Sequence, residues 1–289
     1  MPTETVYGLG ADASNDAATK RIFLVKGRPT NHPLIVHLHD ASTLLEWASV
    51  VPRHAEVLAQ AFWPGPLTMI FKRGPRATDS VTGGQNTIAL RVPRHPVAQA
   101  LLKAFGGGIA APSANRFGSV SPTTAEHVRA DLGNDVALVL DGGPSELGLE
   151  STIVDVSRGA IILLRPGSIT KEELEKVLET EVLTNTSDPE IRAPGQLESH
   201  YAPNARVVVV SAEEAARAQA SATQARDVVV IDASGATEQL DVVAHDLYQR
   251  LRDADLHGAK EVWVVLPSDE GLGRAVRDRL LRAAGPRNT

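Results

Sequence analysis

The sequence predicts an α/β protein with two domains joined by a linker. Short apolar runs rich in β-branched residues alternate with helical patterns along most of the 289 residues. Residues 184–204 interrupt this alternation with three prolines and few aliphatic side chains, which is typical of a connection between domains. Beyond the linker, nearly continuous apolar runs again alternate with helices, which indicates a small three-layer domain with a parallel sheet.

In the first domain, the apolar runs predict strands at 33–39, 67–72, 87–92, 108–112, 136–141, 152–156 and 160–165. A helix is expected from about Ser14 to Lys26. It should end there because Gly27 suits the position after a helix and Pro29 cannot continue one.

Capping boxes mark two more helices of the first domain. Thr123 followed three residues later by Glu126 predicts one helix, which Gly133 should stop. Thr170 followed by Glu173 predicts the other.

The second domain is expected to hold three buried strands and three helices. The predicted strands are 206–211, 227–232 and 261–266, and the predicted helices are 212–225, 240–254 and 271–284. This order of strands and helices favours a parallel sheet.

The composition excludes several classes of protein. With 43% hydrophobic and 22% charged residues, the chain is not disordered, and no apolar run approaches the roughly 18 residues of a membrane helix. The absence of cysteine excludes disulfides, thiolate nucleophiles and Cys-ligated metals. The first residues do not form a signal peptide, so we expect a cytoplasmic protein with no membrane partner. A net charge of −6 disfavours broad binding of nucleic acid but leaves room for a local phosphate site.

Common nucleotide and hydrolase motifs do not explain the chain. Gly8-Leu-Gly10-Ala-Asp-Ala13 fits a relaxed dinucleotide pattern, but only seven residues precede it and no acid follows at the required distance. There is no P-loop and no nucleophile elbow. His37 and His39 share one face of a predicted strand, but nearby ligands for zinc are lacking, so each is expected to be an ordinary polar residue or a contact to a small substrate.

Three clusters indicate a site for an anion. Lys26 and Arg28 follow the first helix, although such a pair is usually surface decoration. Small polar side chains at Ser113 and Asn115 follow a buried strand, where α/β proteins place ligand-binding groups. An arginine that ends an apolar strand, as Arg165 does, is commonly an anion ligand.

The motifs of this chain, in their order, closely resemble those of the YrdC-like family, and in particular its two-domain threonylcarbamoyl-AMP synthases. They are PTETVYGLGADA (2–13), KGRPTNHPLIVH (26–37), WPGPLTMIF (63–71), TIALRVPRHP (87–96), APSANRFGSVSPTT (111–124), ELGLESTIVD (146–155), LLRPG (163–167) and HYAPN (200–204). The resemblance implies a twisted mixed sheet with flanking helices around a concave site, followed by a small Rossmann-like domain. It also implies that L-threonine, bicarbonate and ATP are converted to threonylcarbamoyl-AMP and pyrophosphate for N6-threonylcarbamoyladenosine in tRNA.

The resemblance assigns roles to fourteen residues of this sequence. It implies catalytic roles for Lys26, Arg28, Ser113 and Asn115. It implies ATP contacts from Arg28, His32, Thr87, Ser113, Ser121, Arg165 and Asn204, and threonine contacts from Thr5, His37, Arg91, Ala111 and Ser151. Mg²⁺ is expected to accompany ATP, with no metal site built by the protein. The product would pass to the tRNA threonylcarbamoyl-transferase complex, with a weak contact to tRNA.

The expected domain limits are 1–186 for the catalytic domain, 187–204 for the linker and 205–289 for the second domain. The resemblance implies that an amino-terminal helix and strand are missing from the first domain. It also implies that the linker lies over the nucleotide site as a lid, and we expect this lid, not the second domain's own surface, to serve catalysis.

Two alternatives stay open at this point. One is an RNA-binding module, since residues 51–129 hold nine Lys and Arg against three Asp and Glu, although aromatic side chains for base stacking are few. The other is carbamoyl-adenylate chemistry on a different acceptor.

Overall fold

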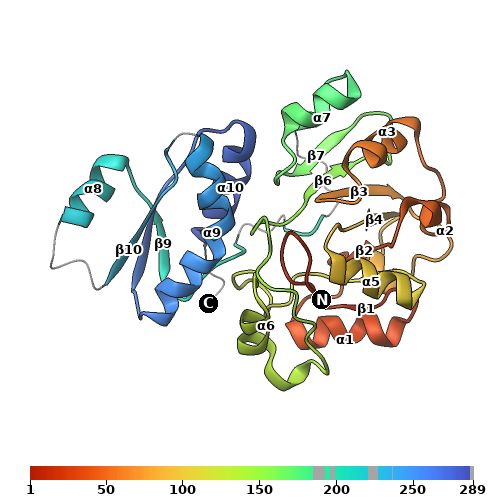
Figure 1. Ribbon diagram of the computed structural model, residues 1–289, viewed down its shortest axis with the longest axis horizontal. Coiled ribbons are helices and arrows are strands. Elements are labelled where there is room, and N and C mark those ends of the chain that lie inside the picture. The colour runs from red at the N-terminus through yellow and green to blue at the C-terminus, as the bar shows by residue number, and fades with distance from the viewer. Residues whose placement is uncertain (185–192, 196–198, 221–226, 236, 287–289) are drawn as a thin grey trace.

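The two predicted domains lie side by side in the computed structural model, joined by the linker (Figure 1). The structure describes residues 1–184, 193–195, 199–220, 227–235 and 237–286. The expected boundary between residues 186 and 187 lies outside the described residues.

An eight-stranded sheet forms the centre of the first domain, and it is mixed, as expected; its two edge strands, β1 and β8, were not among the predicted strands. Its order is β1-β5-β2-β4-β3-β6-β7-β8. The strands are β1 Ala11–Asp12, β2 Ile35–His37, β3 Leu67–Lys72, β4 Thr87–Arg91, β5 Ile109–Ala110, β6 Thr152–Asp155, β7 Ile162–Arg165 and β8 Leu183–Thr184. The pairs β2–β4, β3–β6 and β7–β8 are parallel, and the other pairs are antiparallel.

Local sequence signals account for the ends of several helices around this sheet. The helices are α1 Asp16–Lys26, α2 Leu44–Trp47, α3 Arg53–Phe62, α4 Asp79–Thr82, α5 Pro96–Phe105, α6 Ala125–Leu132 and α7 Lys171–Leu178, with 3₁₀ turns η1 Ala41–Thr43 and η2 Gly133–Asp135. Helix α1 ends at Lys26 as predicted, and the next residue, Gly27, has a left-handed φ of 63°, which favours glycine. The capping box of Thr170 and Glu173 opens α7 as predicted, and α6 stops at Gly133.

Two local predictions were wrong. Thr124, not Thr123, caps α6, because its hydroxyl accepts the hydrogen bond from the backbone N–H of His127. Residues 136–141 are not a strand in the described structure. An apolar run becomes a strand only beside another strand, and Val136 and Val139 instead pack against the small core around Tyr7 and α6.

The second domain is the expected three-layer α/β unit. Its parallel sheet has the order β10-β11-β9, with β9 Arg206–Val209, β10 Val228–Asp232 and β11 Glu261–Val265. Its helices are α8 Ala212–Ala220, α9 Thr237–Leu256 and α10 Gly271–Ala283. Helices α9 and α10 lie on the side of the sheet that faces the first domain, and α8 lies on the other side (Figure 1).

The apolar core of the second domain extends across the domain border. Val6, Val120 and Leu149 of the first domain belong to the same buried cluster as the side chains of α9, α10 and β11. The two domains therefore share a packed interface. In the part of the chain that the structure describes, no helix has the length and apolar character needed to span a bilayer.

Candidate active site

A small cavity of about 50 Å³ lies where the ends of several sheet strands meet the linker. Side chains from the start of the chain, from the ends of β2, β4 and β7, and from the loop after β5 surround it. Pro194, Gly195, His200 and Tyr201 of the linker complete its wall. The described residues of the linker therefore form part of the cavity wall, and its role as a lid over the nucleotide stays a prediction.

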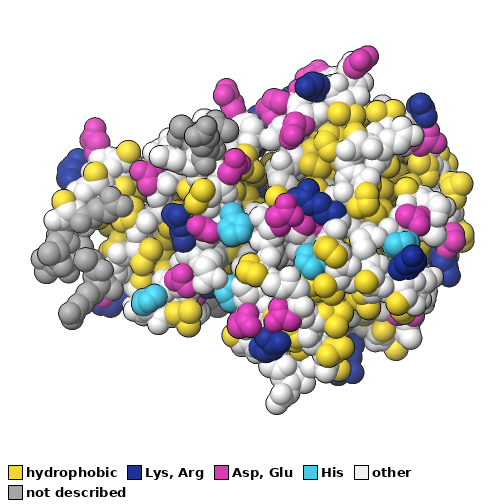
Figure 2. All heavy atoms as spheres, viewed as in Figure 1, with side chains coloured by type: hydrophobic (Ala, Val, Ile, Leu, Met, Phe, Trp, Pro, Cys, Tyr) yellow, Lys and Arg dark blue, Asp and Glu magenta, His cyan; other side chains and the backbone are white. Residues whose placement is uncertain are grey.

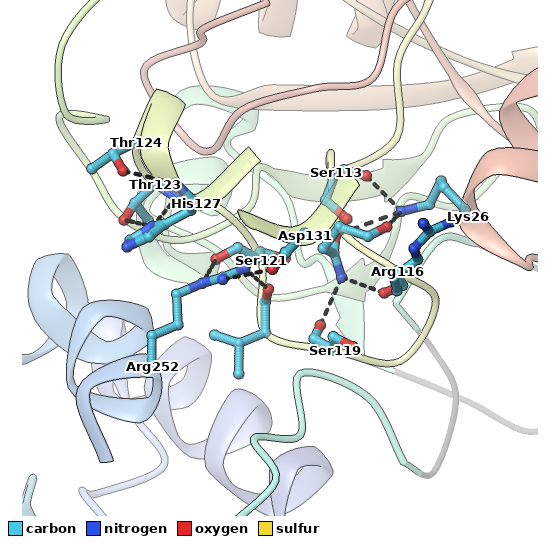
Figure 3. Close-up of polar contacts among 12 residues, drawn as sticks. Lys26, Ser113, Arg116, Ser119, Ser121, Thr123, Thr124, His127, Asp131 and Arg252 are labelled. Carbon is cyan, nitrogen blue, oxygen red and sulfur yellow. Dashed lines mark hydrogen bonds and ion pairs between the residues drawn. The ribbon is translucent and has the colours of Figure 1, made fainter. Parts of the chain in front are cut away.

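The loop after β5 is held from inside by Lys26. Its Nζ donates to the carbonyl oxygens of Ser113 and Asn115, both at 2.6 Å, and lies 3.5 Å from Asn115 Oδ1 (Figure 3). The Asn115 amide nitrogen donates to the carbonyls of Arg116 and Ser119. Burial lowers the pKa of Lys26 well below its usual value. Lys26 and Asn115 thus shape the loop, while Ser113 lines the cavity.

The far end of the same loop is held by the second domain. Arg252 of α9 donates to the carbonyls of Val120 and Ser121 and forms a two-armed ion pair with Asp131 of α6, at 2.9 and 2.6 Å (Figure 3). The second domain therefore contacts the site through its own surface as well as through the linker, to which the sequence analysis assigned its role in catalysis.

Two arginines of the cavity wall carry positive charge. Arg28 donates to the carbonyl of Pro33 at 3.0 Å, and burial lowers its pKa to about 10, so it stays charged at neutral pH. Its buried Nε has no hydrogen-bond partner among the described residues. Arg165 donates to the carbonyl and hydroxyl of Ser151 and to the carbonyl of Pro194. Both guanidinium groups can bind an anion in the cavity.

A third arginine lies at the end of β4. Arg91 donates to Thr5 Oγ1 at 2.8 Å and to the carbonyl of Gly65 at 3.2 Å, and its Nη2 lies 2.8 Å from the carboxylate of Glu4. His37, directly across the β2–β4 ladder, is buried, and this burial lowers its pKa to about 3. Around the end of β4 the cavity wall therefore offers a paired guanidinium, a hydroxyl and a neutral imidazole.

The structure brings together eight of the fourteen residues named from the resemblance: Thr5, Arg28, His37, Arg91, Ala111, Ser113, Ser151 and Arg165. The other six do not line the cavity: Lys26, His32, Thr87, Asn115, Ser121 and Asn204. Thr87 lies at the opposite end of β4 from Arg91, His32 packs edge-on against Phe117, and the backbone N–H of Asn204 donates to Asp255. Ser121 donates to Glu150.

Sequence reasoning missed two carboxylates of the site. Glu150 lines the cavity, and Glu4 pairs with Arg91 behind it. Both lie inside motifs that carry the family resemblance, PTETVYGLGADA for Glu4 and ELGLESTIVD for Glu150. A carboxylate next to several cations indicates a site only after folding has placed the cations beside it. Neither forms a metal site, since no three His, Cys, Asp or Glu side chains among the described residues are grouped to hold an ion.

Two family models match the chain. One, named for Sua5, YciO and YrdC and described as telomere recombination, matches residues 1–167. The other, described as the C-terminal domain of threonylcarbamoyl-AMP synthase, matches residues 169–285.

Individual relatives match the chain over nearly its whole length. It is 40% identical to the threonylcarbamoyl-AMP synthase of Bacillus subtilis over 315 aligned residues, which cover 99% of this chain and 89% of the relative. It is 38% identical to the threonylcarbamoyl-AMP synthase of Pyrococcus abyssi, over 99% of this chain and 90% of the relative. The crystal structure of P. abyssi Sua5 complexed with L-threonine superposes with a TM-score of 0.90 at 37% identity, over 98% of this chain and 89% of that one.

Proposed function

The chain belongs to the Sua5, YciO and YrdC family, and from this membership we propose that it is a threonylcarbamoyl-AMP synthase that makes the adenylate from L-threonine, bicarbonate and ATP. The observation that carries the proposal is the cavity itself. It brings together Arg28 and Arg165, whose guanidinium groups suit phosphates, and Arg91 with Thr5, which suit the carboxylate and hydroxyl of an amino acid.

The reaction needs no nucleophile from the protein. The amine of threonine and bicarbonate form a carbamate with loss of water. An oxygen of this carbamate attacks the α-phosphorus of ATP, the bond to the bridging oxygen breaks, and pyrophosphate leaves. Arg28 and Arg165 stabilise the charge that develops on the phosphates, so catalysis consists of positioning and electrostatics.

The neutral state of His37 fits the threonine side of the cavity. With a pKa of about 3, its imidazole exchanges hydrogen bonds with the substrate without adding a charge beside Arg91. Lys26 supports the reaction through the loop it holds, since its ammonium already has its acceptors.

Magnesium belongs to the substrate in this proposal. Glu150 is a carboxylate of the cavity wall, and both of its oxygens already accept hydrogen bonds. The ion would therefore be bound by the triphosphate and water and enter with ATP. The adenylate would be consumed in the cytoplasm by the complex that transfers the threonylcarbamoyl group to tRNA.

The structure does not favour an RNA-binding module. The arginines of the site are buried within a cavity, and on the face shown in Figure 2 acidic and basic side chains are interspersed. A protein that binds single-stranded nucleic acid along its phosphate backbone instead presents a continuous basic groove.

The test is pyrophosphate release by the purified chain, with mass spectrometry of the adenylate. Release should require ATP, threonine and bicarbonate together, and equal release without threonine would contradict the proposal. Serine should react less well, because the lost methyl contact is worth roughly 1–3 kcal/mol. Salt-sensitive retention of tRNA without ATP would instead support RNA binding.

A further inference from the structure

The second domain contacts the cavity wall at Glu150. The Oε1 atom of this buried carboxylate accepts a hydrogen bond from Ser121 Oγ at 2.6 Å. Its Oε2 atom accepts from the hydroxyl of Tyr248 at 2.6 Å and from Nε of Arg279 at 2.9 Å. Tyr248 lies on α9 and Arg279 on α10, so two of these three donors come from the second domain.

Arg279 joins three parts of the cavity wall. Besides Glu150, it binds the carbonyl of Pro166 at 3.0 Å, directly after Arg165 in the chain. Its guanidinium carbon also lies 5.1 Å from the centre of the Tyr201 ring of the linker. Arg279 does not line the cavity, so it acts on the site only through the groups that it holds.

Tyr201 is held in an unusual conformation by these neighbours. Its φ of 61° is left-handed, which costs a bulky residue about 1–2 kcal/mol. The ring stacks on Tyr248 with centroids 5.5 Å apart and packs against His200 at 4.0 Å. Its hydroxyl, at the cavity, has no hydrogen-bond partner among the described residues. The conformation persists because the second domain holds the ring from two sides.

Apolar packing anchors the same wall. Val6, Val120 and Leu149 are sequence neighbours of the cavity residue Thr5, of Ser121 and of Glu150, and all three are buried in the core of the second domain. A change in the docking of this domain must therefore move several segments of the cavity at once.

Because Glu150 is a buried carboxylate, its negative charge needs nearby cations and hydrogen-bond donors to be stable. Burial by itself would raise the pKa of this carboxyl, but the charges of Arg279 and Arg165 and the bonds from Ser121 and Tyr248 outweigh burial and lower the pKa to about 2. Glu150 is thus ionised at neutral pH, and without Arg279 it would be a buried charge that has lost its closest cation.

We propose that Arg279 is a positioning residue which, together with Tyr248, couples the docking of the second domain to the positions of Tyr201 and Glu150 in the cavity wall. With Tyr201 and Glu150 held, water stays out while the adenylate is present. Without them, water reaches this mixed anhydride and cleaves it to AMP and the threonine carbamate. The inference rests on the proposed function for its readout.

The experiment uses the full chain and compares Arg279→Met, Arg279→Lys and Tyr248→Phe with wild type. Arg274→Met is the matched control, because Arg274 also lies on α10 and crosses the domain border, to Glu172, but does not contact the cavity wall. The measured quantities are the ratio of AMP to threonylcarbamoyl-AMP and the KM for ATP, at a temperature where circular dichroism shows each variant folded.

Arg279→Met should raise the ratio of AMP to adenylate about tenfold or more, since it removes hydrogen bonds to a charged group. Tyr248→Phe should raise it about fivefold. Arg279→Lys should give a ratio between those of Arg279→Met and wild type, and Arg274→Met should give the same ratio as wild type. If Arg279→Met does not fold, the ratio of AMP to adenylate in Tyr248→Phe tests the inference instead. Unchanged product ratios, or an equal rise in Arg274→Met, would overturn the inference, whereas a wild type that makes no adenylate would instead overturn the proposed function.

Discussion

Replacing Lys26 by methionine tests whether this residue supports the site through the loop after β5. The change removes two hydrogen bonds of 2.6 Å from the ammonium and leaves the carbonyls of Ser113 and Asn115 without that donor. Hydrogen bonds from a charged donor contribute about 1.5–3 kcal/mol each, so the gross loss is about 3–6 kcal/mol. Burying the ammonium is itself unfavourable, in line with its lowered pKa, so relief of that cost makes the net loss smaller than this sum.

The assay for Lys26→Met is urea unfolding at constant pH, paired with the KM for ATP. Lys20→Met is the control, because Lys20 lies on the same helix α1 but is exposed, and it should change the free energy of unfolding by less than about 0.5 kcal/mol. We expect Lys26→Met to lose stability and to raise the KM for ATP, because Ser113 shifts. A variant as stable as Lys20→Met that had lost only catalytic rate would refute this reasoning, since Lys26 would then act on the phosphates directly.

Three further changes should have measurable effects. In Gly167→Ala the new methyl would lie 2.5 Å from the backbone nitrogen of Thr152. The free energy of unfolding measured in urea should therefore fall by about 2–3 kcal/mol, and an unchanged value would mean that this backbone can shift to make room. His37 and His200 have pKa values of about 3 in the folded chain and near 6.5 in the unfolded chain. Between these pH values the unfolded chain binds more protons than the folded one, so the free energy of unfolding falls as the pH drops below 6.5. Between pH 6.5 and 5 the loss should be about 2 kcal/mol per histidine in urea titrations, and His37→Gln should remove one of the two contributions. Arg91→Lys should raise the KM for threonine about tenfold with little change for ATP, because lysine cannot make the forked contact; the opposite pattern would reverse the assignment of the two sides of the cavity.

The sequence by itself determined the local structure and the family. Gly27 predicts the end of α1, and Thr170 with Glu173 predicts the start of α7, because each signal acts within one turn of helix. The order of the motifs indicates the family without knowledge of any distance. Most residues that the resemblance assigned to threonine or to phosphate do line one cavity. Half of those that do are tied to strand ends, since His37, Arg91 and Arg165 are the last residues of strands and Ala111 directly follows one.

Only the tertiary structure decided which partner each buried polar group has. Residues 136–141 have the composition of a strand, but a strand also needs a neighbour that the sequence does not reveal. Lys26 reads as a phosphate ligand, yet its ammonium binds the carbonyl of a residue 87 positions away. The buried carboxylate of Glu150 accepts a hydrogen bond from Arg279, which lies 129 positions later in the chain and belongs to the second domain. Caps and turns depend on a few neighbouring residues, whereas a buried charge is satisfied by whichever groups long-range packing brings to it, and that choice is made by the whole fold.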